Sequence, residues 1–137
     1  MTRPDLRRIL AEHLAALNGR DLEGLVSFYA DDAVLELPAS PRVEGREAIR
    51  AAFEVFFEQW EEHSAYDHVL VSGTTAAVEG ITTGRHRTLH LRIPGRIATT
   101  ARQYRHAFAA FFGFRGGRIV RQRVYYDARD LVHQLLG

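Results

Sequence analysis

The sequence predicts an α+β fold: a cone-shaped, curved antiparallel sheet with three N-terminal helices covering an apolar pocket, plus a short C-terminal helix. Apolar residues recur at helical spacing through most of the first 60 positions, and alternating strand patterns fill most of the remainder. Helices grouped before antiparallel strands are typical of a sheet covered on one face. With 137 residues the chain can bury one core, so we expect a single domain over 1–137.

Two helical patterns open the chain. The first covers 6–17, where apolar residues follow helical spacing, and it stops at an Asn-Gly pair, a common C-terminal signal. The second pattern includes Tyr29 as its last apolar position. We expect Asp31 and Asp32 to form a turn that ends this pattern before a short strand over 33–37.

A third helical pattern follows Gly45, and most side chains on its apolar face are aromatic. That face comprises Ile49, Phe53, Phe56, Phe57 and Trp60. Patterns typical of strands then cover 66–71, 76–86, 88–93, 99–114 and 118–126. Asp127 follows the last strand, and we interpret it as the N-cap of a short C-terminal helix rather than a catalytic group.

Side chains alternate along the last predicted strand. Val120, Gln122, Val124 and Tyr126 should share the pocket face, and Ile119, Arg121, Arg123, Tyr125 and Asp127 should share the outer face. Arginine favours paired contacts of the kind found at interfaces. We therefore expect a homodimer, with Arg121, Arg123 and Tyr125 in or beside a two-fold interface.

Composition argues against several partners. A formal charge of +1 provides no dense basic face for nucleic acid. The sequence has no apolar stretch long enough for a membrane span and no apolar signal segment at its start, so we expect a cytoplasmic protein with no membrane partner. The histidines of the predicted strands, His86, His90 and His106, have no carboxylate at a ligand spacing, and we expect neither a metal site nor a cofactor.

Several segments together resemble one superfamily. The run LAALNGRDLEGL at 14–25, the segments YADDAV at 29–34 and GREAI at 45–49, and the C-terminal stretch from 117 onward are similar to the cone-shaped fold of nuclear transport factor two, ketosteroid isomerases, SnoaL-like polyketide cyclases and limonene-epoxide hydrolases. The C-terminal stretch resembles the SnoaL-like branch in particular. This resemblance implies the fold, whereas function depends on the site, because the fold carries unrelated activities.

The isomerase pattern can be compared position by position. The base aspartate of that family, directly before the proline that ends the first short strand, corresponds to Leu37, which cannot move a proton. Its donor tyrosine corresponds to His13, and the supporting tyrosines correspond to Tyr29 and Phe53. Its second, acidic donor corresponds to a position near Ala109.

The other two catalytic patterns are also incomplete. In the cyclases, the aspartate of the last strand corresponds to Val124, and its histidine partner falls near Ala109. In the epoxide hydrolases, an Arg and Asp pair corresponds to the stretch 86–88, and the last-strand aspartate again corresponds to Val124. The resemblance therefore implies a pocket without the carboxylates of its relatives.

His13 and Tyr29 are the catalytic candidates. His13 shares one helical face with Leu6, Leu10 and Leu17, so it should point into the pocket, where a neutral imidazole can give or take a proton. A structural alternative is a core histidine that is hydrogen bonded to a backbone carbonyl or to Tyr29.

Five further residues are candidate ligand contacts. Phe53, Phe57 and Trp60 could form a stacking wall for a flat ligand, although an aromatic stripe also suits plain core packing. Gln122 could orient a ligand carbonyl, and Val124 lies two positions further along the same face.

We interpret the chain as a small-molecule enzyme of the SnoaL-like type. The resemblance implies proton-transfer chemistry, of an isomerase or cyclase, on a hydrophobic carbonyl or polycyclic compound. Because the carboxylate positions of the relatives are Leu37, Ala109 and Val124, a non-catalytic ligand-binding or dimerisation module remains the alternative. A third possibility is an interaction protein whose aromatic side chains fill the cone.

Overall fold

A computed structural model describes residues 3–87, 89–93, 96–100 and 103–136, and only the backbone of 89–93 and 96–100. The elements are α1 (Leu6–Asn18), α2 (Leu22–Val26), β1 (Tyr29–Glu36), β2 (Val43–Glu44), α3 (Arg46–Gln59), β3 (Trp60–Ser72), β4 (Thr75–His86), β5 (Leu89–Ile93), β6 (Arg96–Thr100), β7 (Gln103–Arg115), β8 (Arg118–Tyr126) and α4 (Ala128–Leu136). The predicted α+β class, with helices before the main sheet and a short helix at the end, is confirmed.

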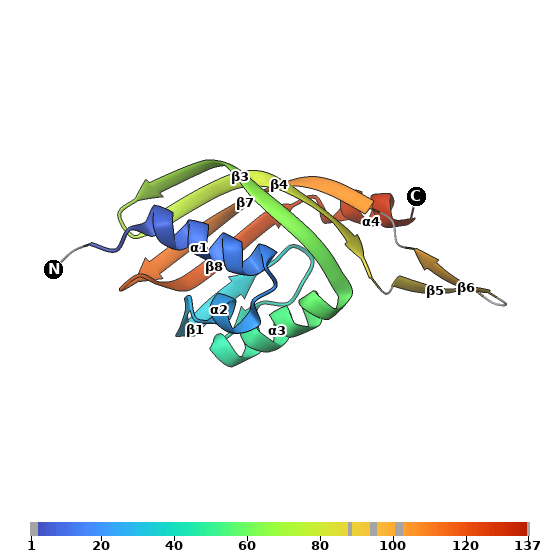
Figure 1. The fold of residues 1–137 in the computed structure, drawn as a ribbon, viewed down its shortest axis with the longest axis horizontal. Coiled ribbons are helices and arrows are strands. Elements are labelled where there is room, and N and C mark those ends of the chain that lie inside the picture. The colour runs from blue at the N-terminus through green and yellow to red at the C-terminus, as the bar shows by residue number, and fades with distance from the viewer. Residues whose placement is uncertain (1–2, 88, 94–95, 101–102, 137) are drawn as a thin grey trace.

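The main sheet has six strands in the order β2-β1-β8-β7-β4-β3, and β5 pairs with β6 in a separate two-stranded sheet. Figure 1 shows the main sheet as a curved layer with α1, α2 and α3 gathered on one side, and the β5–β6 hairpin extending from one end. The β3–β4 and β7–β8 ladders both contain register shifts, which bend the strands and increase their twist. None of the described helices is long and apolar enough to cross a membrane.

One pair in the sheet is parallel rather than antiparallel. β1 runs parallel to β8, with Val34 opposite Arg121 and Leu35 opposite Gln122. A parallel pair needs a long connection between its strands, and here most of the chain lies between them. The antiparallel prediction holds for the other neighbours and is wrong for this pair, because local sequence patterns carry no information about strand direction.

Tyr29 begins β1 and does not belong to the second helix. The helix α2 ends at Val26, and the backbone N–H of Ile119 donates to the Phe28 carbonyl at 2.8 Å, which draws the following residues into the sheet. Asp31 and Asp32 therefore lie exposed within β1 instead of forming the predicted turn. Strand pairing with β8 overrides the helical spacing of Tyr29 with the residues before it.

Trp60 is likewise a strand residue. It caps the C-terminus of α3 in an extended conformation and pairs with His86 at the start of β3. The third predicted helix is therefore shorter by one residue than its aromatic stripe suggested, and β3 begins six residues before the predicted start at Tyr66. The pairing partner lies 26 positions away in the sequence, so helical periodicity alone cannot detect the change.

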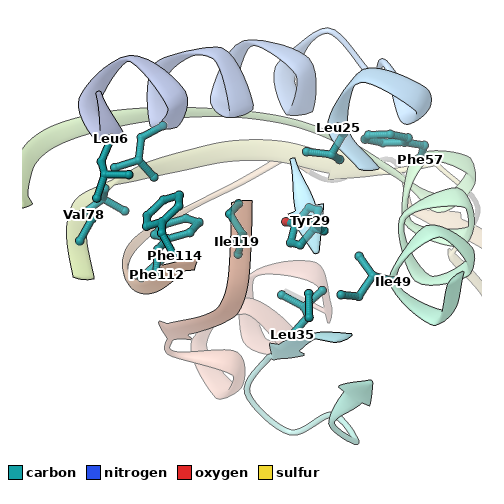
Figure 2. Packing of buried hydrophobic residues seen from close by; sticks show 14 residues of the cluster. Leu6, Leu25, Tyr29, Leu35, Ile49, Phe57, Val78, Phe112, Phe114 and Ile119 are labelled. Atoms are coloured by element: carbon teal, nitrogen blue, oxygen red, sulfur yellow. The ribbon is translucent and has the colours of Figure 1, made fainter. Parts of the chain in front are cut away.

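The core lies between the helices and the inner face of the sheet. Figure 2 shows Leu6 of α1 near Val78, Phe112 and Phe114 of the sheet, and Leu25 of α2 near Phe57 of α3. Apolar side chains of this kind supply most of the stabilising free energy, at about 25 cal/mol for each Å² removed from water.

Two predictions at the C-terminal end have different outcomes. Asp127 is the N-cap of α4, since the Asp130 backbone N–H donates to its Oδ1 at 2.9 Å, as predicted. Ile119, however, is fully buried rather than outward. The register shift after Gly113 pairs Ile119 with Phe114 and turns both side chains into the core.

Candidate functional site

A cavity of about 310 Å³ lies between the helices and the sheet. Residues of α1, α3, α4 and strands β1, β3, β4, β7 and β8 line it, and most of their side chains are apolar or aromatic. Small-molecule pockets usually measure about 300–1,000 Å³, so this cavity lies at the small end of that range.

Three polar side chains form a hydrogen-bonded chain at the cavity wall. His13 Nε2 lies 2.9 Å from the Tyr29 hydroxyl oxygen, and the Tyr29 hydroxyl donates to Gln122 Oε1. His13 is 1% exposed, Tyr29 is fully buried and Gln122 is 7% exposed. The chain joins α1, β1 and β8, and residues 93 positions apart in the sequence meet through it.

The hydrogen bonds fix the protonation of His13. A hydroxyl has one proton, and Tyr29 gives its proton to Gln122, so His13 Nε2 must carry a proton and donate to Tyr29. His13 Nδ1 is then an acceptor, and it is buried without a partner among the described residues. Burial lowers the pKa of His13 from 6.5 to about 4, so the ring is neutral at physiological pH.

Gln122 lines the cavity. Its Oε1 is occupied by Tyr29, whereas its Nε2 makes no hydrogen bond within the described part of the chain. An unpaired amide N–H at an apolar cavity wall can donate to a ligand oxygen.

The candidate ligand contacts divide into two groups. Phe53, Trp60 and Val124 line the cavity, as does Gln122. Phe57 does not line it, whereas Phe56 does. Residues 56 and 57 are both neighbours of residue 53 on the helix surface. The Phe57 ring stacks on Phe53 with centroids 6.3 Å apart, and Figure 2 shows it beside Leu25 in the core.

Glu62 is a site residue that sequence reasoning missed. It lines the cavity from β3, and the Tyr104 hydroxyl of β7 donates to its Oε2. Burial raises the pKa of the Glu62 carboxyl, and the hydrogen bond from Tyr104 opposes that rise. The signal was present in the sequence: once β3 is extended to Trp60, strand alternation places residue 62 on the inner face.

The strand histidines have aromatic neighbours. The His86 ring lies edge-on to Trp60, with centroids 4.4 Å apart, and His106 stacks on Tyr126 at 4.8 Å. The side chain of His90 lies outside the described residues. Within the described ranges, no group of three or more His, Asp or Glu side chains is placed to hold a metal ion.

The positions that carry carboxylates in related enzymes are apolar here. Leu37 and Val124 line the cavity. Ala109 lies on the other face of β7, and the residues that line the cavity are its neighbours Phe108 and Ala110. Neither of these two neighbours is a carboxylate.

The structure thus combines an α+β fold, a curved sheet with helices on one side, with an apolar cavity under those helices. A sequence model of the SnoaL-like domain matches residues 10–122, and the chain belongs to this family. No curated protein is significantly similar to the chain in sequence.

Solved structures agree with this assignment at the level of the fold. A protein from Pseudomonas putida KT2440, provisionally described as a polyketide cyclase, is 23% identical with a TM-score of 0.82, and the match covers 93% of this chain and 95% of that one. A protein with a ketosteroid isomerase-like fold from Catenulispora acidiphila DSM 44928, in complex with trimethylamine, is 19% identical with a TM-score of 0.78, and the match covers 98% of this chain and 94% of that one. An LEH-like epoxide hydrolase from M. tuberculosis is 18% identical with a TM-score of 0.74, covering 94% and 87%.

Proposed function

We propose that this chain is a small-molecule enzyme that binds a compact, hydrophobic carbonyl compound and catalyses a proton transfer on it. The observation that carries the proposal is the apolar cavity with the unpaired Gln122 amide on its wall. Names of structurally similar proteins, which include a polyketide cyclase and an epoxide hydrolase, support small-molecule chemistry in a fold of this shape.

Within this proposal, His13 and Tyr29 orient Gln122. The Tyr29 hydroxyl holds Gln122 Oε1, which leaves the amide N–H groups directed elsewhere, and the neutral His13 holds Tyr29. A role for His13 as acid or base requires an accessible nitrogen, but its Nε2 is engaged and its Nδ1 is covered. The geometry therefore favours His13 as a neutral donor over the proton-transfer role considered from sequence.

The volume of the cavity also limits the size of the ligand. About 310 Å³ is the volume of roughly ten molecules of liquid water, at about 30 Å³ each. A compound with one or two rings suits this space better than a larger polycyclic one. Phe53, Phe56 and Trp60 provide aromatic walls for such rings.

Binding of 2-tetralone, compared with tetralin, tests the proposal. The two probes share a bicyclic frame, and only 2-tetralone has a carbonyl. We expect the wild type to bind 2-tetralone more tightly by about 0.5–1.5 kcal/mol, the net value of one hydrogen bond. Titration followed by protein NMR measures both dissociation constants.

Two variants identify the site in this experiment. In Gln122→Met the preference for 2-tetralone should disappear, while Tyr29 can donate to His13 Nε2 in its other tautomer. Ala52→Phe fills the cavity from α3 and should abolish binding of both probes. Wild-type protein that binds neither probe would refute a binding cavity, and binding that survives Ala52→Phe would place the ligand elsewhere.

A homodimer through the outer sheet face is a further part of the proposal. Phe111 and Tyr125 are 51% and 45% exposed there, and their rings are in edge-to-face contact at 6.2 Å. The predicted arginines already have a partner within the chain, because Arg121 and Arg123 lie 3.4 and 3.5 Å from Glu36 carboxylate oxygens. The apolar pair, rather than the arginines, is therefore the expected centre of the interface.

Light scattering at micromolar concentration checks this expectation. The wild type should have the mass of two chains, and Phe111→Arg should have the mass of one, since it places a cation beside Arg123 and its symmetry mate. A monomeric wild type at this concentration would contradict the dimer.

A further inference from the structure

Glu62 is the one carboxylate among the described residues that line the cavity. The described part of the lining contains no arginine, and the chain has no lysine at all. Among the described residues of the cavity, Glu62 therefore has no cationic partner, which disfavours the ionised form of its carboxyl group. Isolated carboxylates of this kind are expensive for a fold and concentrate at functional sites.

The strand β3 places two adjacent glutamates in opposite environments. Glu62 shares the inner face with Trp60, Ser64 and Tyr66, which all line the cavity. Glu61 lies on the other face, where its carboxylate is 2.6 Å from Arg85 Nε and 3.3 Å from Arg87 Nε. Glu61 is thus a paired surface carboxylate, whereas Glu62 is an unpaired cavity carboxylate.

Tyr104 holds Glu62 in place. Its side chain is 3% exposed, and its hydroxyl donates to Glu62 Oε2 across 42 positions of sequence. The absence of a side chain at Gly84 makes room for this contact, because a Cβ atom there would lie 2.7 Å from the Tyr104 hydroxyl oxygen. Glu62 Oε1 has no hydrogen bond within the described part of the chain, so it can accept a proton from a ligand.

Glu62 also has a route to solvent. Together with Tyr104 it lines a surface depression between β3, β4 and β7, whose other lining residues include Arg20, Arg85 and Arg105. A proton taken up inside the cavity can therefore exchange with water on the outer side. A group that acts in turn as acid and base needs such a path for proton exchange with water.

We propose that Glu62 is the catalytic acid and base of the cavity and that Tyr104 is its positioning residue, acting on a small uncharged ketone. The inference rests on the proposed function above and names the group that moves the proton. Glu62 replaces His13 in that role, because Glu62 Oε1 is free while both His13 nitrogens are engaged or covered.

The step conserves atoms and electrons. Glu62 Oε1 takes a proton from the carbon next to the carbonyl, and the C–H bonding pair becomes the C=C bond of an enolate. The carbonyl π pair moves onto oxygen, which accepts a hydrogen bond from the Gln122 amide. The Glu62 carboxyl then returns a proton to the same carbon or to a conjugated one, which gives exchange or isomerisation without a co-reactant.

The charge of the cavity limits the substrate class. A carboxylate or phosphate on the ligand would face Glu62 with no arginine in the described lining to pair with it. Neutral compounds avoid this repulsion, so selection against anions is part of the inference.

Hydrogen–deuterium exchange of 2-tetralone tests the proposal. We expect wild-type protein in D₂O to accelerate exchange of the protons next to the carbonyl, followed by proton NMR of the probe. Glu62→Gln should lower the protein-dependent rate by about 100-fold or more, because one general base contributes about 10²–10⁴. Binding of 2-tetralone should be unchanged, since glutamine keeps an acceptor for Tyr104.

Glu61→Gln is the matched control, with the same chemical change one residue away on the outer face. Its exchange rate should equal that of the wild type. The role of Glu62 is wrong if 2-tetralone binds but its protons exchange no faster than in buffer. It is also wrong if the Glu62→Gln protein accelerates this exchange as much as the wild type does. In either case the proposal that the cavity binds the ketone stands. If 2-tetralone does not bind, the proposed function itself fails and the role of Glu62 fails with it.

Two further readouts, a pH profile and a melting temperature, complete the test. Because the Tyr104 hydrogen bond lowers the pKa of Glu62, Tyr104→Phe should move the acid limb of the exchange–pH profile to higher pH.

Burial raises the pKa of Glu62 above 4.5, so its ionisation opposes folding once the pH exceeds that value. Glu62→Gln should therefore melt at a higher temperature than the wild type at pH 7, with the difference vanishing below pH 4.5. An unchanged profile, or equal melting temperatures at pH 7, would overturn the assignment.

Discussion

Acidification from pH 6.5 to 4 should cost the protein about 3 kcal/mol of unfolding free energy through His13 alone. Its pKa is about 4 in the folded chain and 6.5 when unperturbed, and each unit is worth about 1.36 kcal/mol. As the pH falls below 6.5, the unfolded chain binds a proton at this position before the folded chain does. Stability is thus retained above pH 6.5 and lost toward pH 4.

Chemical denaturation at a series of pH values measures this loss. Other groups also titrate in the same range, so the informative quantity is the difference between the wild type and His13→Phe, which cannot bind the proton. His133→Gln, on the exposed side of α4, is the control and should follow the wild-type curve. If His13→Phe loses as much stability as the wild type between pH 6.5 and 4, His13 is not buried in its neutral form.

Leu10→Ala should lower the free energy of unfolding by about 3–5 kcal/mol. Leu10 is 1% exposed, and it lies on the face of α1 that also carries His13, three residues further on. The substitution removes apolar contacts and leaves a cavity that the neighbours fill only partly. Because Leu10 anchors the helix that positions His13, the His13–Tyr29 hydrogen bond should also weaken.

Leu70→Ala is the matched control for this prediction. Leu70 is 68% exposed on β3, so the same change of side chain should cost less than about 0.5 kcal/mol. Urea unfolding of both variants gives the comparison. Equal losses in the two variants would mean that α1 does not pack on the sheet as described.

The two glutamates of β3 bear on how function should be sought in this family. Glu61 and Glu62 are adjacent and chemically identical, yet one is ion-paired at the surface and the other lies in the cavity. The carboxylate positions of the related enzymes are Leu37 and Val124 in the cavity lining here, and a search limited to those positions would conclude that no acid or base is present. A strand on another side of the same cavity can provide one.

Local sequence patterns were sufficient to predict several elements. The first helix was predicted over 6–17 and is α1, Leu6–Asn18; the last strand was predicted at Arg118–Tyr126 and is β8 with the same bounds. His13 was placed on the inner face of α1, where the structure has it. These predictions succeed because helical and strand periodicity, with the stop signals at their ends, depend only on residues a few positions apart.

Contacts between distant segments determined the features that local patterns could not predict. Tyr29 and Trp60 fit a helical pattern, but hydrogen bonds to β8 and β4 make them strand residues, and the register shift near Gly113 turns Ile119 inward. The site itself depends on pairs far apart in sequence: Gln122 meets Tyr29 across 93 positions and Tyr104 meets Glu62 across 42. Periodicity assigns a side chain to a face of its own element, but only the packing of the sheet and helices determines which faces share a cavity, and therefore which carboxylate lies inside it.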